Sequence, residues 1–303
     1  MLLAEFISRG IAALEPLYPT AEARSIVLML CGEIIGTKNY THIVEPRHEI
    51  APERLAPLQA AMERLKAGEP IQYVIGKAEF CGRTFSVTPD VLIPRPETEL
   101  LALEAVKIAS RIQRMRLPYG NSAEPVRVLD LCTGSGNIAW TVALGVPGAL
   151  VTGVDKSASA LKVARGQNFA AEMKTTGAIA PAFVEADVLD FGQISRFGKF
   201  DIVLSNPPYI MDKEKPLMRR NVLDYEPSEA LFVPDDDPLL FHRAIAVWSE
   251  RLLGADGKGL TEINEALGAE TLAVFSREPF QKAELVKDFY DKNRFVLYMK
   301  PAV

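Results

Sequence analysis

Strand and helix signals alternate from Val126 almost to the end of the chain, and this alternation restricts the fold more than any other feature. Short apolar runs bounded by turn residues predict strands at residues 126–131, 150–154, 183–186, 200–204, 259–263 and 295–299. Helical spacing predicts helices at residues 138–144, 157–171 and 238–253. Repeated β-α units form a mostly parallel sheet with helices on both faces. We therefore expect an α/β fold for this region.

The residues before this region have a different pattern. Apolar side chains recur at helical spacing at Leu3, Phe6, Ile7, Ile11 and Leu14. Further helices are predicted at residues 21–35 and 52–66, so the first part of the chain reads as a helical bundle. Short strands follow at residues 73–76, 78–80 and 84–87, with a turn at residues 81–83. A long helix then runs from Pro96 to about Arg114, and residues 115–125 form a polar loop.

These patterns divide the chain of 303 residues into three regions. We expect a helical bundle over residues 1–72, a β-hairpin linker over residues 73–95 and an α/β domain over residues 96–303.

Charge and cysteine content argue against several classes of protein. The formal net charge is −5, from 34 basic and 39 acidic residues, and nucleic-acid affinity rests on clustered cations, so we expect no direct nucleic-acid binding. The three cysteines lack paired spacing and the three histidines are scattered, so neither a disulfide framework nor a metal site is predicted. No signal peptide and no bilayer-spanning run is evident. We expect a cytoplasmic protein without membrane association, and we expect a monomer.

The strand at residues 200–204 stops at Ser205, and Asn206-Pro207-Pro208-Tyr209 follows. Prolines cannot extend a ladder, and each restricts the residue before it to extended conformations. Asn206 and the Pro207 carbonyl are therefore held at the carboxyl end of a strand, where open α/β sheets bind ligands. Two acceptors side by side suit a planar NH2 group, and Tyr209 could stack on it. A proline-rich turn without chemistry is the alternative for this segment alone.

A tight turn, Thr133-Gly134-Ser135-Gly136, follows the first predicted strand. Gly134-x-Gly136-x-x-Ala139 satisfies the dinucleotide fingerprint, and Asp155 ends the next strand about 20 residues later. A nicotinamide or flavin enzyme is therefore a genuine competitor. In either case the glycines let the backbone approach the ligand, and Asp155 suits ribose hydroxyls.

Two further acids favour a different cofactor. Asp130 lies just before the turn, where its carboxylate would repel a pyrophosphate. S-adenosylmethionine has no phosphate and carries a sulfonium and an ammonium group, so Asp130 becomes favourable. Asp187 ends the third strand and is suited to accept a hydrogen bond from an adenine amino group. Three strand-end acids around one glycine turn are best explained by S-adenosylmethionine.

This cofactor combined with the Asn206 segment indicates methyl transfer to a planar, conjugated nitrogen. Such a nitrogen is a poor nucleophile because its lone pair is delocalised. Accepting both N–H hydrogens would orient it toward the methyl group. Adenine N6, guanine N2 and the side-chain amide of glutamine all have such a nitrogen.

Several segments, in order, resemble one family, the peptide-chain release factor glutamine N5-methyltransferases (HemK/PrmC). The resemblance rests on residues 68–76, on Pro94-Arg95-Pro96-Glu97-Thr98-Glu99, on the Asp130 loop, and on residues 206–210, 225–231 and 287–294. The Asn-Pro-Pro-Tyr tetrad alone is shared with adenine-N6 methyltransferases of DNA. The Pro-Arg-Pro-Glu-Thr-Glu segment behind a helical N-terminal region is much more specific.

The resemblance implies a class I S-adenosylmethionine-dependent methyltransferase fold, Rossmann-like, with a mostly parallel seven-stranded sheet, an N-terminal all-helical domain and a β-hairpin linker. It implies methylation of the glutamine in the Gly-Gly-Gln motif of class I release factors, which act in translation termination. The N-terminal bundle would help to bind the factor.

The resemblance and the residue patterns together give a set of candidate site residues. The catalytic candidates are Asn206, Pro207 and Tyr209. The cofactor-binding candidates are Asp130, Thr133, Gly134, Gly136, Asp155, Asp187 and Asn206. The substrate-binding candidates are Asn206, Pro207, Pro208, Tyr209 and Arg95. No metal is expected.

Alternatives and departures from the family pattern remain. A ribosomal-protein glutamine or adenine in DNA would be the other methyl acceptors, and a cofactor-binding adaptor without activity is a third class. A DNA enzyme must extrude its base and bind phosphates, and the best local cations for that are Lys213, Lys215, Arg219 and Arg220. Three positions depart from the usual family residues, which are glycines: Cys132, Pro238 and Asn264.

Overall fold

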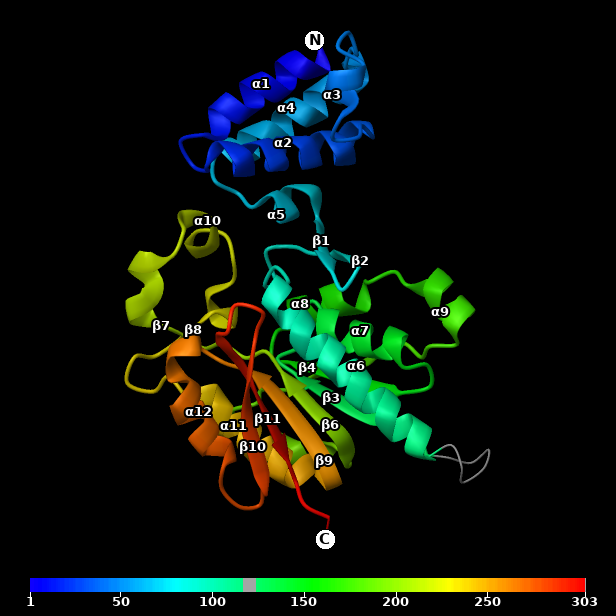
Figure 1. Ribbon diagram of the computed structural model, residues 1–303, viewed down its shortest axis with the longest axis vertical. Helices are drawn as coiled ribbons and strands as arrows, with labels where there is room; N and C mark the ends of the chain where they lie inside the picture. Colours follow the sequence, from blue (N-terminus) through cyan, green and yellow to red (C-terminus); the bar gives the residue numbers. More distant parts are fainter. Residues whose placement is uncertain (117–123, 303) are drawn as a thin grey trace. The chain divides into compact units, whose positions relative to one another are not determined.

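The computed structural model describes residues 1–116 and 124–302, so residues 117–123 of the predicted polar loop lie outside the described residues. The chain divides into two units, drawn in Figure 1. The first contains residues 1–77 and 218–225, and the second contains residues 78–217 together with those from 226 onward. The short segment 218–225 therefore belongs to the N-terminal unit although it is distant in sequence.

The first unit is helical, as predicted. Its helices are α1 (Leu3–Leu14), α2 (Thr20–Ile35), α3 (Thr41–Val44), α4 (Pro52–Lys66), α5 (Ile71–Ile75) and α10 (Arg220–Leu223). The apolar faces of α1, α2, α4 and α5 form one core that includes Leu14, Leu30 and Leu65, each fully buried. The segment 218–225 joins this unit because Arg219 pairs with Glu22 at 2.7 Å and the Tyr225 hydroxyl donates to the Ala67 carbonyl at 2.9 Å.

One predicted strand in this region is wrong. Residues 73–76 were expected to be extended, because Tyr73, Val74 and Ile75 favour strands. They instead complete α5, which begins after Pro70 and ends at Gly76 in the left-handed conformation, φ 71°. Ile71 is buried in the helical core and Val74 and Ile75 pack against it. Packing against neighbouring helices therefore overrides the local preference.

The second unit contains a seven-stranded sheet in the order β10-β11-β9-β6-β3-β4-β5. Its strands are β3 (Arg127–Leu131), β4 (Leu150–Asp155), β5 (Ala182–Glu185), β6 (Phe200–Ser205), β9 (Leu253–Glu262), β10 (Lys282–Lys287) and β11 (Asn293–Met299). The pairings among β5, β4, β3, β6 and β9 are parallel, and β11 is antiparallel to both of its neighbours. The mostly parallel seven-stranded sheet is confirmed.

Two short sheets accompany this sheet. The predicted hairpin is present as β1 (Lys77–Phe80) and β2 (Arg83–Ser86), joined by Cys81 and Gly82, which both have positive φ. The other pair is β7 (Ile210–Met211) with β8 (Phe232–Val233). Short 3-10 helices occupy residues 191–196, 212–217, 228–230 and 265–267.

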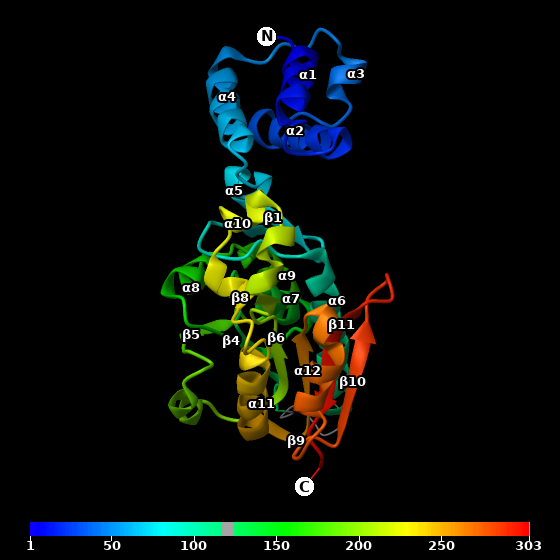
Figure 2. The same ribbon diagram turned by 90° about the vertical axis from the view of Figure 1, so that its left-hand side faces the viewer.

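Helices cover both faces of the large sheet (Figures 1 and 2). One face packs against α6 (Pro96–Arg116) and α7 (Asn137–Gly145), and the other packs against α11 (Leu240–Leu252) and α12 (Gly268–Phe275). Successive side chains of a strand point to opposite faces of the sheet, so each face has its own core. Val128 lies in the core of the first face and Leu129 in the core of the second.

The helix predicted over residues 157–171 is wrong as a single element. It is divided into α8 (Ala158–Arg165) and α9 (Ala170–Thr176). The break places the Gln167 side chain inward, where its Oε1 accepts from Ser86 N–H at 2.9 Å and its Nε2 donates to the carbonyls of Ser86 and Ser135. These bonds join the hairpin to the glycine turn.

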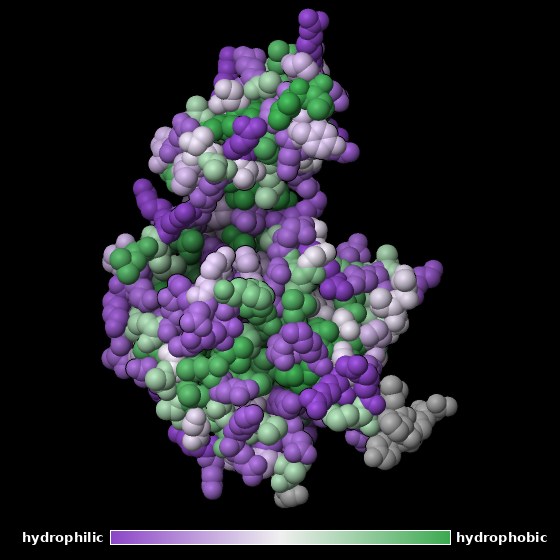
Figure 3. All heavy atoms as spheres, viewed as in Figure 1, coloured by the Kyte–Doolittle hydropathy of each residue, from purple (hydrophilic) through white to green (hydrophobic). Residues whose placement is uncertain are grey.

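The register of the parallel strands aligns their carboxyl ends. Leu131 is the partner of Val154 and of Ser205, and Asp155 is the partner of Glu185. The residues that follow these strands therefore meet at one edge of the sheet. Within the described residues no helix is both long and apolar enough to cross a bilayer. Figure 3 shows hydrophilic side chains spread over much of the visible face.

Candidate active site

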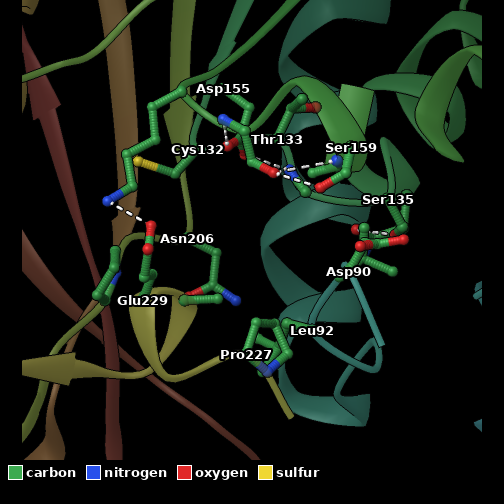
Figure 4. A pocket seen from close by; sticks show the side chains of 18 of the residues that line it. Asp90, Leu92, Cys132, Thr133, Ser135, Asp155, Ser159, Asn206, Pro227 and Glu229 are labelled. Atoms are coloured by element: carbon green, nitrogen blue, oxygen red, sulfur yellow. Dashed lines mark hydrogen bonds and ion pairs between the residues drawn. The ribbon is translucent and has the colours of Figure 1, made fainter. Parts of the chain in front are cut away.

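A cavity of about 380 Å³ lies at the carboxyl edge of the parallel strands (Figure 4). Most of the predicted site residues line it, namely Arg95, Thr133, Gly134, Asp155, Asp187, Asn206 and Pro208. Four predicted site residues are not part of its wall: Asp130, Gly136, Pro207 and Tyr209. The cavity thus unites the proposed cofactor turn with the Asn206 segment.

The glycine turn has a left-handed backbone at three positions. Cys132, Gly134 and Gly136 have φ values of 60°, 53° and 76°. Gly136 starts α7, and a Cβ there would lie 3.0 Å from the Phe183 ring, so this glycine serves close packing. Cys132 holds a conformation that only glycine adopts without strain. This explains why a glycine is the usual residue at that position in the family that the sequence resembles.

The strain at Cys132 gives a stability prediction. We expect Cys132→Gly to raise the free energy of unfolding by about 1 kcal/mol, because it removes the left-handed strain of a residue with a Cβ. Urea unfolding of both proteins measures this difference. Cys31→Gly is the matched control, since Cys31 lies inside α2 and glycine there must destabilise. Equal destabilisation by both substitutions would contradict the prediction.

Asp155 connects the end of β4 to the glycine turn. Its Oδ2 accepts from Gly134 N–H at 2.9 Å and its Oδ1 accepts from Ser157 N–H at 3.0 Å. Burial raises the pKa of this carboxyl, while the two backbone donors oppose that shift. A carboxylate has about four lone-pair sites, so two remain for hydroxyl donors in the cavity. Asp155 therefore fits a ribose.

Asp130 lies beneath the turn and is fully buried. Its Oδ2 accepts from the Thr133 hydroxyl at 2.6 Å, while its Oδ1 has no hydrogen-bond partner among the described residues. Burial raises the pKa of Asp130 to about 7. A positively charged ligand group near the turn would favour the ionised form of Asp130, whereas a pyrophosphate there would be repelled by that form.

Asp187 and an ion pair complete the cofactor side of the cavity. Asp187 follows β5, lines the cavity and uses its Oδ1 to accept from Leu189 N–H at 2.8 Å. Lys156 Nζ and Glu229 Oε2, which also line the cavity, pair at 2.7 Å (Figure 4). Lys156 and Glu229 were not predicted from the sequence.

The Asn206 segment follows β6 directly. The end of β6 is held in place because the Ser205 hydroxyl donates to the Leu131 carbonyl at 2.8 Å. Asn206 and Pro208 face the cavity, whereas Pro207 is buried outside its wall. The Tyr209 hydroxyl donates to Glu262 Oε1 at 2.9 Å, so its ring is held away from the cavity wall.

Two buried residues near Asn206 were not predicted as site residues. Asn206 Nδ2 donates to Thr98 Oγ1 at 3.2 Å, and Thr98 Oγ1 donates to Glu262 Oε2 at 2.7 Å. Thr98 and Glu262 are each 1% exposed. Burial raises the pKa of Glu262, and the hydrogen bonds from Thr98 and Tyr209 oppose that shift. Thr98 lies within the Pro-Arg-Pro-Glu-Thr-Glu segment that carries the family resemblance. Nothing in the sequence, however, indicates that Thr98 contacts Asn206.

Arg95 is held in place at the cavity wall. Its Nη2 donates to Glu226 Oε1 at 2.7 Å, and Glu226 Oε2 accepts from Ile93 N–H at 3.1 Å. The side chain of Glu226 is 2% exposed and that of Arg95 is 31% exposed. Arg95 therefore keeps donors for a substrate while its direction is fixed. Glu226, from the segment at residues 225–231, is a further residue that was not predicted.

His242 is a buried residue that contacts the backbone of Glu262. It is 1% exposed, and its Nε2 donates to the Glu262 carbonyl at 2.9 Å. Burial lowers the pKa of His242 to about 4. The folded protein therefore binds fewer protons here than the unfolded chain between pH 6.5 and pH 4, and this contribution to stability is lost as the pH falls through that window.

A pH prediction follows from His242. We expect the difference in unfolding free energy, wild type minus His242→Gln, to shrink by about 2 kcal/mol between about pH 6.5 and pH 5. Denaturant unfolding of both proteins at several pH values measures it. Asp130, whose pKa is raised, makes the unfolding free energy increase as the pH falls in both proteins. Taking the difference between the two proteins cancels this contribution. A constant difference across this range would refute the assignment of His242 as a neutral buried base.

Comparisons with known proteins identify the relatives of this chain. The chain matches the family model of the PrmC N-terminal domain over residues 5–76 and that of the methyltransferase small domain over residues 106–223. It is 36% identical to a release factor glutamine methyltransferase from Bacteroides thetaiotaomicron, covering 94% of this chain and 95% of that protein. A protein of the same name from Flavobacterium psychrophilum is 33% identical, with 98% of each chain covered.

A solved structure is also similar, that of a release factor-specific protein-(glutamine-N5) methyltransferase from Alicyclobacillus acidocaldarius. It is 25% identical with a TM-score of 0.41, covering 72% of this chain and 99% of that chain. The two relatives above share 36% and 33% identity with this chain over nearly the full length of each protein. This chain therefore belongs to the family of release factor glutamine methyltransferases.

Proposed function

We propose that this chain transfers a methyl group from S-adenosylmethionine to the side-chain amide nitrogen, N5, of the glutamine in the Gly-Gly-Gln motif of class I peptide chain release factors. Translation termination would be the process that this protein methylation modulates. One observation carries the proposal: Asn206 lines the same cavity as Gly134, Asp155 and Asp187.

The acids around the turn support the cofactor assignment. Asp155 offers free lone pairs for ribose hydroxyls, and Asp187 can accept from the adenine amino group. Asp130, hydrogen-bonded to Thr133 of the turn, has a raised pKa, and the ammonium group of the cofactor would favour its ionised form. When bound, S-adenosylmethionine supplies a methyl group on a positively charged sulfur.

The Asn206 segment would hold the glutamine. Asn206 Oδ1 and the Pro207 carbonyl would accept the two N–H hydrogens of the substrate amide and direct its nitrogen at the methyl group. Arg95, fixed by Glu226, would contact the substrate backbone or side chain at the cavity wall. Alignment of two reactants in this way can supply on the order of 7–11 kcal/mol of the barrier. No strongly basic residue is needed, because the proton can leave after transfer.

The proposal includes the partner and the cellular setting. The helical region, residues 1–72, would recognise the release factor, residues 73–95 would act as the linker, and residues 96–303 would form the methyltransferase domain. The enzyme would be a cytoplasmic monomer that does not bind nucleic acid directly. Three of the four cations that most favoured DNA form ion pairs within the chain: Lys215 with Asp212, Arg219 with Glu22 and Arg220 with Asp224.

The test presents labelled S-adenosylmethionine to the enzyme with a class I release factor, ribosomal protein and DNA in parallel. We expect label only in the release factor, and mass spectrometry should place it on the Gly-Gly-Gln glutamine. A release factor with that glutamine replaced by alanine is the matched control. Label in ribosomal protein or in DNA, and none in the release factor, would support one of the alternative substrates instead.

A second comparison tests the role of the helical region. The enzyme should act with a higher kcat/KM on the full-length release factor than on a short Gly-Gly-Gln peptide, because only the former offers a surface beyond the glutamine. Equal values would show that recognition is confined to the cavity. Light scattering of the enzyme alone tests the monomer.

A further inference from the structure

We propose that Thr98 and Glu262 are positioning residues that fix which end of the Asn206 side chain faces the substrate. The inference rests on the proposed function, and it concerns how the substrate amide is oriented. Asn206 Nδ2, Thr98 Oγ1 and Glu262 Oε2 form one continuous chain of hydrogen bonds, with lengths of 3.2 Å and 2.7 Å. The Tyr209 hydroxyl ends the chain on Glu262 Oε1 at 2.9 Å.

The direction of each hydrogen bond follows from the carboxylate. The two hydroxyl groups that contact Glu262 favour its ionised form, in which a carboxylate only accepts, and a threonine hydroxyl has one hydrogen. Both oxygens of Glu262 accept from hydroxyl groups, one from Thr98 and one from Tyr209. Thr98 therefore donates its one hydroxyl hydrogen to Glu262 and can only accept a hydrogen bond from Asn206. Asn206 must turn its NH2 group toward Thr98, which leaves Oδ1 for the cavity.

This polarity matters because an asparagine amide has two ends of nearly equal shape. With Oδ1 toward the substrate, Asn206 accepts an N–H of the glutamine amide. With the amide rotated by half a turn, two NH2 groups would face each other and the contact would be repulsive. Asn206 alone has no means of distinguishing these two states. The Thr98–Glu262 pair would supply that discrimination.

A purely structural role explains the pair less well. Burying a carboxylate costs several kcal/mol unless it is fully satisfied, and an apolar side chain of similar volume often serves packing equally well. Glu262 is satisfied by hydroxyl donors from two different segments, α6 and the loop after β6. Its backbone is also held, by His242. Such support is what a residue that orients another residue requires.

The decisive variant is Thr98→Val, which has nearly the same shape and lacks the hydroxyl. We expect kcat for release factor methylation to fall by about 10-fold, because the Asn206 amide loses its fixed orientation. The dissociation constant for S-adenosylmethionine should stay unchanged. Thr98→Ser keeps the hydroxyl and should restore most of kcat. Thr271→Val is the matched control, since that buried threonine donates to its own helix at the Leu267 carbonyl.

Glu262→Gln provides an independent variant if Thr98→Val folds poorly. A glutamine can donate as well as accept, so it no longer forces the Thr98 hydrogen in one direction, and kcat should fall with an unchanged cofactor affinity. Unchanged kcat in both Thr98→Val and Glu262→Gln would overturn the inference. An equal loss in Thr98→Ser and Thr98→Val would also overturn it. If the wild-type enzyme itself fails to methylate the release factor, the proposed function falls and this inference falls with it.

Discussion

Asn206→Ala is expected to lower kcat for release factor methylation by about 10³-fold while leaving the affinity for S-adenosylmethionine nearly unchanged. The substitution removes one of the two acceptors that would hold the substrate amide, so the nitrogen is no longer aligned with the methyl group. The cofactor side of the cavity should be preserved, because Gly134, Asp155 and Asp187 are held by bonds that do not involve Asn206. Steady-state turnover and calorimetry measure the two quantities separately.

A matched control for this variant is Asn168→Ala, an exposed asparagine outside the cavity, which should leave both quantities unchanged. Parallel loss of cofactor binding and of turnover in Asn206→Ala would show that Asn206 acts mainly on the cofactor. Full turnover in that variant would remove the amide-holding role altogether.

Asp155→Ala should weaken the binding of S-adenosylmethionine by about 1.5–3 kcal/mol, or about 10- to 150-fold in Kd. The variant loses the charge-assisted bond to a ribose hydroxyl. It also releases the N–H groups of Gly134 and Ser157, which shape the turn. At saturating cofactor kcat should fall much less, since Asn206 is not in contact with Asp155. Calorimetric titration with S-adenosylmethionine gives the Kd directly.

Asp190→Ala is the matched control for this prediction. Asp190 also accepts from a backbone N–H, that of Gly192 at 3.0 Å, but it does not line the cavity. Its replacement should leave the Kd unchanged. An unchanged Kd in Asp155→Ala would place the ribose at another part of the cavity.

Local sequence patterns predicted the buried parallel strands well. Strands such as β3 and β6 are mostly apolar and buried, and both were predicted within one residue of their observed bounds. The edge strand β10 was not predicted, because none of its residues is fully buried and its charged side chains resemble a loop. The α5 helix was mistaken for a strand because its core contacts lie elsewhere in the helical unit.

Some residues of the candidate site were predicted from the sequence and others were not. The glycine turn and the Asn206 segment were found from the sequence because each is a contiguous stretch in which glycine or proline restricts the backbone. Thr98 and Glu262 were not found, although both lie in segments that had been singled out. The departure at Asn264 also acquires a role only in the structure, where Nδ2 donates to Glu214 at 2.9 Å and Oδ1 accepts from Ala266 N–H at 3.0 Å.

The α/β class, the cofactor turn and the acceptor pair at the end of β6 can all be predicted from the sequence, because each depends on residues adjacent in the chain. The distant side chains that support that pair become visible only in the folded protein. Thr98 lies 164 residues from Glu262 and 108 residues from Asn206. Their contact depends on the strand order, which places β9 beside β6, and on the packing of α6 against that face of the sheet. Hydrogen bonds between such segments leave no periodic trace in the sequence, because each requires only one polar residue on each segment.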